Sequence, residues 1–378
     1  MIEQLALLFG RSHRVVRRAI IVLCYLLVLA SALYLPLLFD QFRSQKTLNV
    51  YAFTETFSPE SLELFEKKTG IKVNMTYAEL DEEIGAKFSI NAGAGYDVVN
   101  VSDFMVHFLA NKGYLQPLNK SKIKGVERLD ARLMGHTYDK ANHYSLPHKW
   151  FMYGLIYDKE FFNVPPDEMS LKMIFEDPVL LCKQGIVQNP YRICMLASPL
   201  DAYFMTMLYV FNRVDWFTST ELTEVANTLI KQKQWVECYS FNSVEYFLLS
   251  GIVPIALTAS NFMRKIWESS DRFDFAIPKE GGIIIIENLV IPAVSKKSEL
   301  AHQFIEFMLS DEMATLNSET YGWTSSNCVA QKVLDEGHSD KQSHLFPSKE
   351  IFQRLQIPLF NSYARKCADN AWLRVSCA

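Results

Sequence analysis

The alternation of strand and helix patterns between residues 48 and 101 constrains the fold more than any other feature of the sequence. Three short runs rich in β-branched and aromatic residues predict strands, at 48–53, 71–77 and 96–101. Ser58-Pro59 opens an amphipathic helix after the first run, and three acids at 81–83 begin a helix after the second. Strands that alternate with helices at this spacing favour a parallel sheet with helices on its faces.

The remaining chain predicts a second region of the same α/β class. With 378 residues, the protein is too long for one ordinary hydrophobic core, so two lobes are expected. The further strands are expected at 151–157, 186–187, 252–257 and 273–277. The further helices are expected at 104–113, 201–211, 220–232, 243–249 and 300–309.

Residues 278–292 combine a Gly-Gly turn, four consecutive isoleucines and one carboxylate, Glu287. An unbroken run of β-branched residues is typical of a strand buried on both faces. A carboxylate between two apolar runs needs a partner or a ligand, because burying it alone is costly. We interpret Glu287 as a ligand-binding residue at a point where the chain passes between two lobes.

The N-terminus has the pattern of an export segment. Arginines at 11, 14, 17 and 18 precede an apolar run over 19–39, which Asp40 closes. Such a run is long enough to cross a bilayer, so residues 1–40 are expected to form a transmembrane anchor with a cytoplasmic basic flank. The alternative is a cleaved signal peptide, for which 30–32 offer small residues. Either alternative places the chain after about residue 40 outside the cytoplasm.

Composition and motifs exclude several classes of function. The net charge is −4 and no long basic stripe with interleaved aromatics follows the N-terminus, so we expect no nucleic-acid partner. G-x-S-x-G, H-E-x-x-H and Walker motifs are absent and the eight histidines lack metal-ligand spacing, so we expect no catalysis, no metal and no cofactor. Of seven cysteines, Cys24 lies in the apolar run; the sequence leaves the pairing of the others open and favours buried thiols.

Several short stretches resemble, in order, the substrate-binding proteins of bacterial ABC importers, most closely the spermidine/putrescine-binding branch. The resemblance covers about 47–331. The matching stretches are Leu48-Asn-Val-Tyr-Ala-Phe-Thr-Glu55, Leu64-Phe-Glu-Lys-Lys-Thr-Gly-Ile-Lys-Val73, Tyr96-Asp-Val-Val99 with Ser102, Leu146-Pro147 with Trp150, Pro278-Lys-Glu-Gly-Gly282, Leu289-Val-Ile-Pro292 and Gly322-Trp-Thr-Ser-Ser-Asn327.

The resemblance implies a two-lobed periplasmic-binding-protein fold (type II) whose lobes close about a hinge. Lobe 1 would comprise 47–150 plus 287–331, and lobe 2 would comprise 151–286 plus 332–378. The implied protein is a periplasmic monomer and not an enzyme. It would bind a small cationic polyamine and deliver it to an ABC permease in the inner membrane.

The resemblance also implies a set of ligand-binding residues. Polyamines need aromatic faces for their methylenes and carboxylates for their ammonium groups. Glu287 stands at the family's ammonium-binding aspartate, and Trp150 is expected to form a wall of the cleft. The full set is Phe53, Thr54, Glu55, Ser102, Phe104, Trp150, Tyr191, Thr258, Glu287 and Trp323.

The second lobe departs from the family. We align its acidic binding segment with 189–193, which contains no carboxylate, and Leu257 and Ile285 replace two tryptophans. One amine end at Glu287, with the rest of the ligand in an apolar slot, is the expectation. A shorter amine, an amino acid, a phosphonate or an anchored sensor remain alternatives. An anionic ligand would have only Arg192 and Lys149 as candidate partners.

Overall fold

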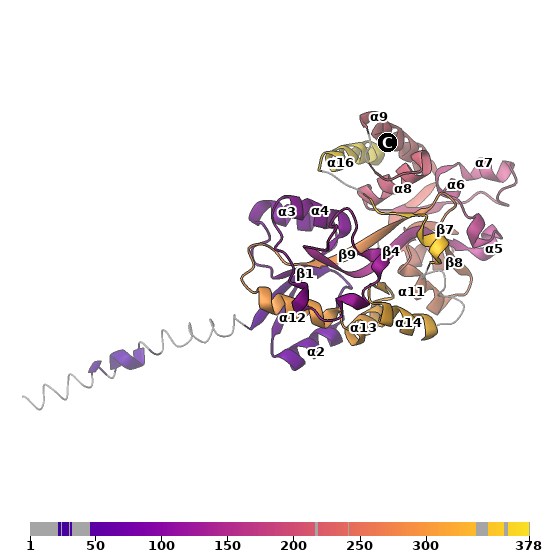
Figure 1. Ribbon diagram of the computed structural model, residues 1–378. Coiled ribbons are helices and arrows are strands. Elements are labelled where there is room, and N and C mark those ends of the chain that lie inside the picture. Colours follow the sequence, from indigo (N-terminus) through magenta and orange to yellow (C-terminus); the bar gives the residue numbers. More distant parts are fainter. Residues whose placement is uncertain are drawn as a thin grey trace, which may run out of the picture.

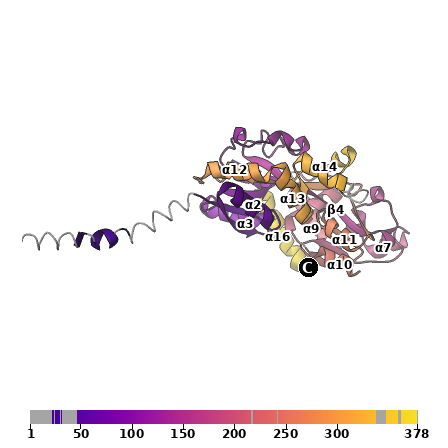
Figure 2. The same ribbon diagram turned by 90° about the horizontal axis from the view of Figure 1, so that it is seen from below.

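The structure is a computed structural model, and it describes residues 22–23, 25–29, 31, 46–215, 218–240, 242–337, 347–358 and 362–377. The described chain forms a mixed α/β fold with two groups of helices at opposite ends, one around α2 and α3 and one around α7 and α11 (Figure 1 and Figure 2). One twisted sheet runs through both ends in the order β2-β1-β3-β9-β4-β7-β5-β6.

The first end of the sheet is the parallel unit that the sequence predicts. β1 pairs in parallel with β2 on one side and with β3 on the other. Alternate side chains of β1 enter two cores: Val50 packs with Phe65 of α2, and Tyr51 packs with Ile84 of α3. The elements are β1 (Thr47–Phe53), α2 (Pro59–Thr69), β2 (Lys72–Ala78), α3 (Asp81–Asn91), β3 (Val98–Ser102) and α4 (Asp103–Asn111).

Two long antiparallel strands join the ends of the molecule. They are β4 (Ser145–Asp158) and β9 (Gly282–Val290), and the four isoleucines lie in β9 as predicted. Both strands are almost entirely buried. β3 pairs with β9 on one side, and β7 pairs with β4 on the other. The predicted lobe boundaries at 150 and 286 therefore fall inside these strands and stay a prediction.

The second end of the sheet carries four further strands and the helices between residues 159 and 269. β5 pairs in parallel with β6 and β7. The strands are β5 (Ile193–Leu196), β6 (Val236–Ser240), β7 (Ile255–Ala259) and β8 (Phe273–Ala276). The helices are α5 (Lys159–Phe162), α6 (Lys172–Phe175), α7 (Pro178–Lys183), α8 (Pro199–Phe211), α9 (Ser219–Gln232), α10 (Val244–Leu249) and α11 (Phe262–Ser269).

The C-terminal elements return to both ends. α12 packs on α2, and α14 packs on α13 and β10, whereas α16 packs on α8 and α9. The predicted boundary at 331 divides α14. The elements are α12 (Ser298–Met308), α13 (Asp311–Tyr321), β10 (Thr324–Ser325), α14 (Cys328–Gly337), α15 (Lys349–Phe352), β11 (Leu355–Gln356) and α16 (Ser362–Cys377).

The structure corrects one sequence expectation, and a second one lies almost wholly outside the described residues. The strand expected at 186–187 is wrong: Gly185 adopts φ +73° after α7, and the chain turns before entering β5. The predicted anchor over 1–40 lies almost wholly outside the described residues. Within the part of the chain that the structure describes, no helix is long and apolar enough to cross a membrane. The described cysteines 182, 194, 238, 328 and 377 are free thiols.

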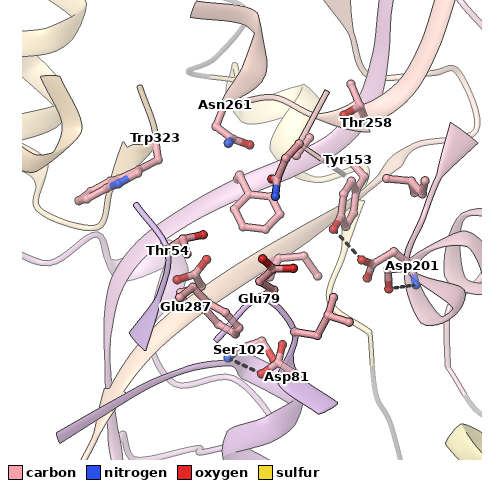
Figure 3. Close-up of a pocket in the computed structure, with 18 of the residues that line it drawn as sticks. Thr54, Glu79, Asp81, Ser102, Tyr153, Asp201, Thr258, Asn261, Glu287 and Trp323 are labelled. Carbon is pink, nitrogen blue, oxygen red and sulfur yellow. Dashed lines mark hydrogen bonds between the residues drawn. The ribbon is translucent and has the colours of Figure 1, made fainter. Parts of the chain in front are cut away.

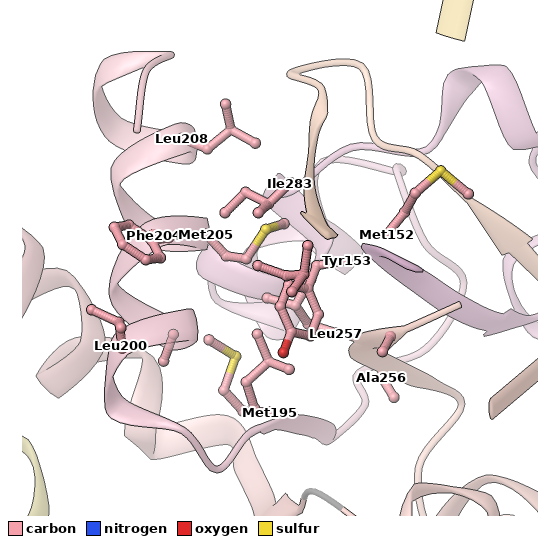
Figure 4. Close-up of a cluster of buried hydrophobic side chains, with 14 of the residues drawn as sticks. Met152, Tyr153, Met195, Leu200, Phe204, Met205, Leu208, Ala256, Leu257 and Ile283 are labelled. Atoms are coloured by element: carbon pink, nitrogen blue, oxygen red, sulfur yellow. The ribbon is translucent and has the colours of Figure 1, made fainter. Parts of the chain in front are cut away.

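Helix α8 anchors the second end of the sheet. Its apolar face packs against the central strands, with Met205 and Leu208 on the side of Leu257 and Ile283 (Figure 4), and Phe204 belongs to the same buried cluster. Ser198 caps the helix by accepting a hydrogen bond from the backbone N–H of Asp201. The packing of this face and the Ser198 cap together fix the first turn of α8, which lines the cavity described below.

We expect Phe204→Ala to destabilise the protein by about 3–5 kcal/mol, because removal of this fully buried ring would leave a cavity in the core around α8. Urea unfolding followed by circular dichroism measures the change. Tyr246→Ala on the exposed face of α10 is the matched control and should stay within about 0.5 kcal/mol. Equal effects of the two substitutions would contradict this role of α8.

Candidate functional site

A cavity that is partly open to solvent lies between the two ends of the sheet. Its wall combines carboxylates with aromatic rings and small polar side chains. Among the described residues that line the cavity, Lys149 is the one lysine or arginine. The carboxylates are Glu55, Glu79, Asp81, Glu82, Asp201 and Glu287. The aromatic residues are Phe53, Phe104, Phe151, Tyr153, Phe262 and Trp323.

The cavity lies where parallel strands end. Asp81 follows the end of β2, Ser102 ends β3, and Ser240 ends β6. Asp201 follows β5 in the first turn of α8. Ligand sites of open α/β sheets lie beyond the carboxyl ends of the strands, because the connecting loops and helix starts gather there. The fold thus brings acidic groups from both ends of the molecule to one cleft.

On the side of the first lobe, Asp81 begins α3 and faces the cavity (Figure 3). Its Oδ1 accepts a hydrogen bond from the backbone N–H of Ser102 at 3.3 Å. Burial raises the pKa of Asp81 well above its ordinary range, and the nearby charges of Glu82 and Glu287 act in the same direction. A cation in the cleft would relieve this crowding of negative charge.

On the side of the second lobe, Asp201 supplies a carboxylate that lies beside the Tyr153 side chain (Figure 3). The Tyr153 hydroxyl donates a hydrogen bond to Asp201 Oδ2 at 2.8 Å. Burial raises the pKa of Asp201 to about 6, although the hydrogen bonds from Tyr153 and Ser198 act to lower it. Asp201 is therefore largely ionised at neutral pH and can accept from an ammonium group.

Glu287 reaches the cavity but already has a cationic neighbour. It stands opposite Lys149 in the β4–β9 ladder, and the Lys149 Nζ lies 3.3 Å from Glu287 Oε2. Both side chains are only 7% exposed. Burial raises the pKa of Glu287, while the Lys149 ammonium acts to lower it. The Lys149 Nζ also lies 5.6 Å from the ring centre of Trp323, within cation–π range.

The cavity wall contains most of the predicted site residues. Trp323 is held by a hydrogen bond from its Nε1 to the Glu55 carbonyl at 3.0 Å. Glu55 itself is half exposed and pairs with Lys265 at 3.3 Å. The predicted residues in the wall are Phe53, Thr54, Glu55, Ser102, Phe104, Thr258, Glu287 and Trp323. Their part in ligand binding stays a prediction.

Two predicted residues lie elsewhere. Trp150 is not a cleft wall, because side chains alternate along β4: Lys149, Phe151 and Tyr153 face the cavity and Trp150 faces the opposite side. There it is fully buried and donates from Nε1 to the Ser325 carbonyl at 3.1 Å. Tyr191 is also a core residue, since its hydroxyl donates to the Met173 carbonyl at 2.8 Å.

The sequence prediction missed Glu79, Asp81, Glu82 and Asp201. The acids at 81–83 correctly predict the start of α3, and their place after a parallel strand was the signal for a site. The segment 189–193 contains no carboxylate, and Asp201 places a carboxylate in the cavity wall eight residues later. The sequence suggested Lys149 only as a partner for an anionic ligand. Arg192 lies outside the cavity wall and pairs with Glu237 at 3.1 Å.

Within the described ranges, no group of three or more histidine, cysteine, aspartate or glutamate side chains is arranged to hold a metal ion. The carboxylates of the cavity instead lie among aromatic rings, with Phe53, Phe104 and Phe151 close by. Such a wall suits an organic cation with apolar methylene groups.

Comparison with known proteins assigns the chain to a family. Residues 60–344 match the model of the bacterial extracellular solute-binding proteins, so the chain belongs to this family, whose members are binding proteins and not enzymes. The two-lobed α/β fold agrees with that class.

The names of individual relatives state a ligand. The chain is 27% identical to the spermidine/putrescine-binding periplasmic protein of Escherichia coli, over 86% of this chain and 90% of the relative. It is 24% identical to a putrescine/cadaverine-binding protein of Pseudomonas aeruginosa, over 89% and 95% of the two chains. The structure of a spermidine/putrescine transporter substrate-binding protein from Streptococcus pneumoniae superposes with a TM-score of 0.72 at 21% identity, covering 88% of this chain and 98% of that one, which shows the shared fold.

We expect ionisation of Asp201 to contribute a loss of stability as pH rises from about 4 to about 6, whereas buried His148, whose pKa is lowered to about 3, contributes in the opposite direction. The pKa of Asp201 is about 6 in the folded chain and about 3.9 when unfolded, so the folded state binds more protons across this window. The pKa of buried Asp103 is raised to about 7 and extends the effect. Urea midpoints at pH 4, 5, 6 and 7.5 measure the net change.

Asp201→Asn should reduce this pH dependence, because the amide oxygen still accepts from Tyr153 but does not titrate. Asp215→Asn, at an exposed ion pair with Arg213, is the control and should follow the parent protein. The explanation fails if the stability of the Asp201→Asn variant and that of the parent change by the same amount between pH 4 and pH 6.

Proposed function

We propose that this protein is the extracytoplasmic solute-binding component of an ABC importer and that it binds a linear polyamine in the cleft between its lobes. The observation that supports this most strongly is the presence of acidic groups on both sides of the cleft. Asp81 and Glu79 come from one side, Asp201 comes from the other, and aromatic rings lie between them. A flexible chain with an ammonium group at each end matches this arrangement.

The charge of the wall supports a cation over the alternatives. Six carboxylates and one lysine line the cavity, and Lys149 is already paired with Glu287. An anion such as a phosphonate would find no unpaired arginine or lysine among the described residues of this wall. An amino acid would bring a carboxylate into the same negative surroundings, where like charges repel. The names of the relatives, which include spermidine, putrescine and cadaverine, point to the same ligand class.

The mode of action follows from the sheet. β4 and β9 continue from one lobe to the other, so bending of these strands can bring Asp201 toward Asp81 around a ligand. A ligand that contacts both sides favours the closed form, because its ammonium groups compensate carboxylates on both lobes. A closed, loaded protein is the form that we propose an ABC permease receives.

The first test is isothermal titration of the purified protein with putrescine, cadaverine and spermidine at pH 7.5. We expect at least one of these amines to bind with a micromolar or lower Kd. Asp201→Asn should weaken binding by about 10- to 150-fold, which corresponds to loss of a charged hydrogen bond worth about 1.5–3 kcal/mol.

Glu237→Gln is the matched control, because it removes a carboxylate of the same lobe that lies outside the cavity and pairs with Arg192. Its affinity should equal that of the parent protein. The proposal is wrong if none of the three amines binds, or if Asp201→Asn binds them as tightly as the parent does.

A further inference from the structure

The Glu287 end of the cleft is already filled by the chain itself. The Lys149 Nζ lies 3.3 Å from Glu287 Oε2 and 5.6 Å from the ring centre of Trp323. These are the two contacts that a ligand ammonium would be expected to make at this end, one with a carboxylate and one with an aromatic face. A lysine side chain is itself an ammonium group on a chain of four methylenes, so it reproduces one end of a polyamine.

The backbone fixes Lys149 in this position. It lies in β4 between two neighbouring strands, opposite Glu287 of β9 on one side and opposite Ser325 of β10 on the other. Lys149 is buried, and rotation of its side chain away from the pair would leave the Glu287 carboxylate buried without a cation. The lysine is therefore a permanent part of the wall and does not belong to a mobile loop.

Asp81 lies on the same side of the cleft as this pair, because Ser102, whose backbone N–H it accepts from, stands opposite Glu287 in the β3–β9 ladder, whereas Asp201 comes from the other side. Asp81 is paired with the Ser102 backbone, and Asp201 with the Tyr153 hydroxyl; both partners are uncharged. An ammonium group of a ligand can thus be neutralised at either of these carboxylates. A third ammonium group directed toward Glu287 would meet the Lys149 cation, and repulsion between like charges is strong in a buried site.

We propose that Lys149 is a specificity-determining residue, a built-in counter-ion that closes the Glu287 subsite and makes the cleft select diamines over triamines. This inference rests on the proposed polyamine-binding function. It assigns the two ends of a diamine to the Asp81 and Asp201 sides. It also explains why a carboxylate at the Glu287 position is retained in a wall where it cannot serve as a free anchor.

The test compares the Kd values of putrescine and spermidine by isothermal titration in the full-length protein and in Lys149→Met. The parent protein should prefer putrescine. The substitution removes the competing cation and exposes Glu287 to the third ammonium group, so the ratio of the two Kd values should move toward spermidine by at least tenfold. Lys149→Arg keeps the charge and should keep the parent preference.

Two further variants secure the interpretation. In Lys149→Met/Glu287→Gln the carboxylate is lost as well, so the gain in spermidine binding should disappear. If Lys149→Met does not fold, Lys149→Gln provides the same comparison, because its amide can still donate a hydrogen bond to Glu287.

The outcomes separate this inference from the proposed function. The proposed role of Lys149 is wrong if the parent protein binds putrescine but the Kd ratio is unchanged in Lys149→Met. It is also wrong if the parent already prefers spermidine. In both cases the proposed function stands. If neither the parent nor the variant binds any amine, both are wrong. A tenfold or larger shift that depends on Glu287 supports both.

Discussion

The pairing of β4 with β9 is the interaction on which the rest of the structure depends. These strands are the central pair of the sheet, connect its two ends, and carry Tyr153, Lys149 and Glu287 into the cleft. Because side chains alternate along a strand, one ladder supplies both the hydrophobic centre and the cleft wall. Trp150 and Met152 face one side and Lys149, Phe151 and Tyr153 face the other. A shift of one residue in the register would exchange these sets and remove both the core and the site.

The cleft concentrates negative charge in a partly buried place, and this has a consequence for binding. Burial raises the pKa values of Asp81, Asp201 and Glu287, so keeping these groups ionised is unfavourable in the empty protein. A cationic ligand offsets that unfavourable energy on both lobes at once. The Lys149–Glu287 pair already does so at one end by means of the chain itself. The chain itself thus neutralises one carboxylate of the cleft, while Asp81 and Asp201 have uncharged partners.

Sequence patterns predicted the fold well because the strongest signals are local. The runs at 48–53 and 71–77 and the isoleucines of β9 are periodic or continuous patterns that specify strands without long-range information. The site was harder, because it is assembled from distant segments. Glu287 could be found since a lone carboxylate in an apolar run is unusual. Asp201 looks like an ordinary helix-start acid until β5 and β4 bring it beside Tyr153. The position of Trp150 was harder to predict, because the residue type does not show which face of β4 it occupies. The partner of Glu287 depends on the register with a strand more than a hundred residues away.

The most direct test is a crystal structure of the protein grown with putrescine. The account predicts an amine that spans the cleft, with one nitrogen within hydrogen-bond distance of Asp201, the other near Asp81 or Glu79, and Lys149 still paired with Glu287. An amine whose nitrogen lies on Glu287, with Lys149 displaced, would contradict the assignment of the subsites. A cleft without amine at saturating putrescine would contradict the account as a whole.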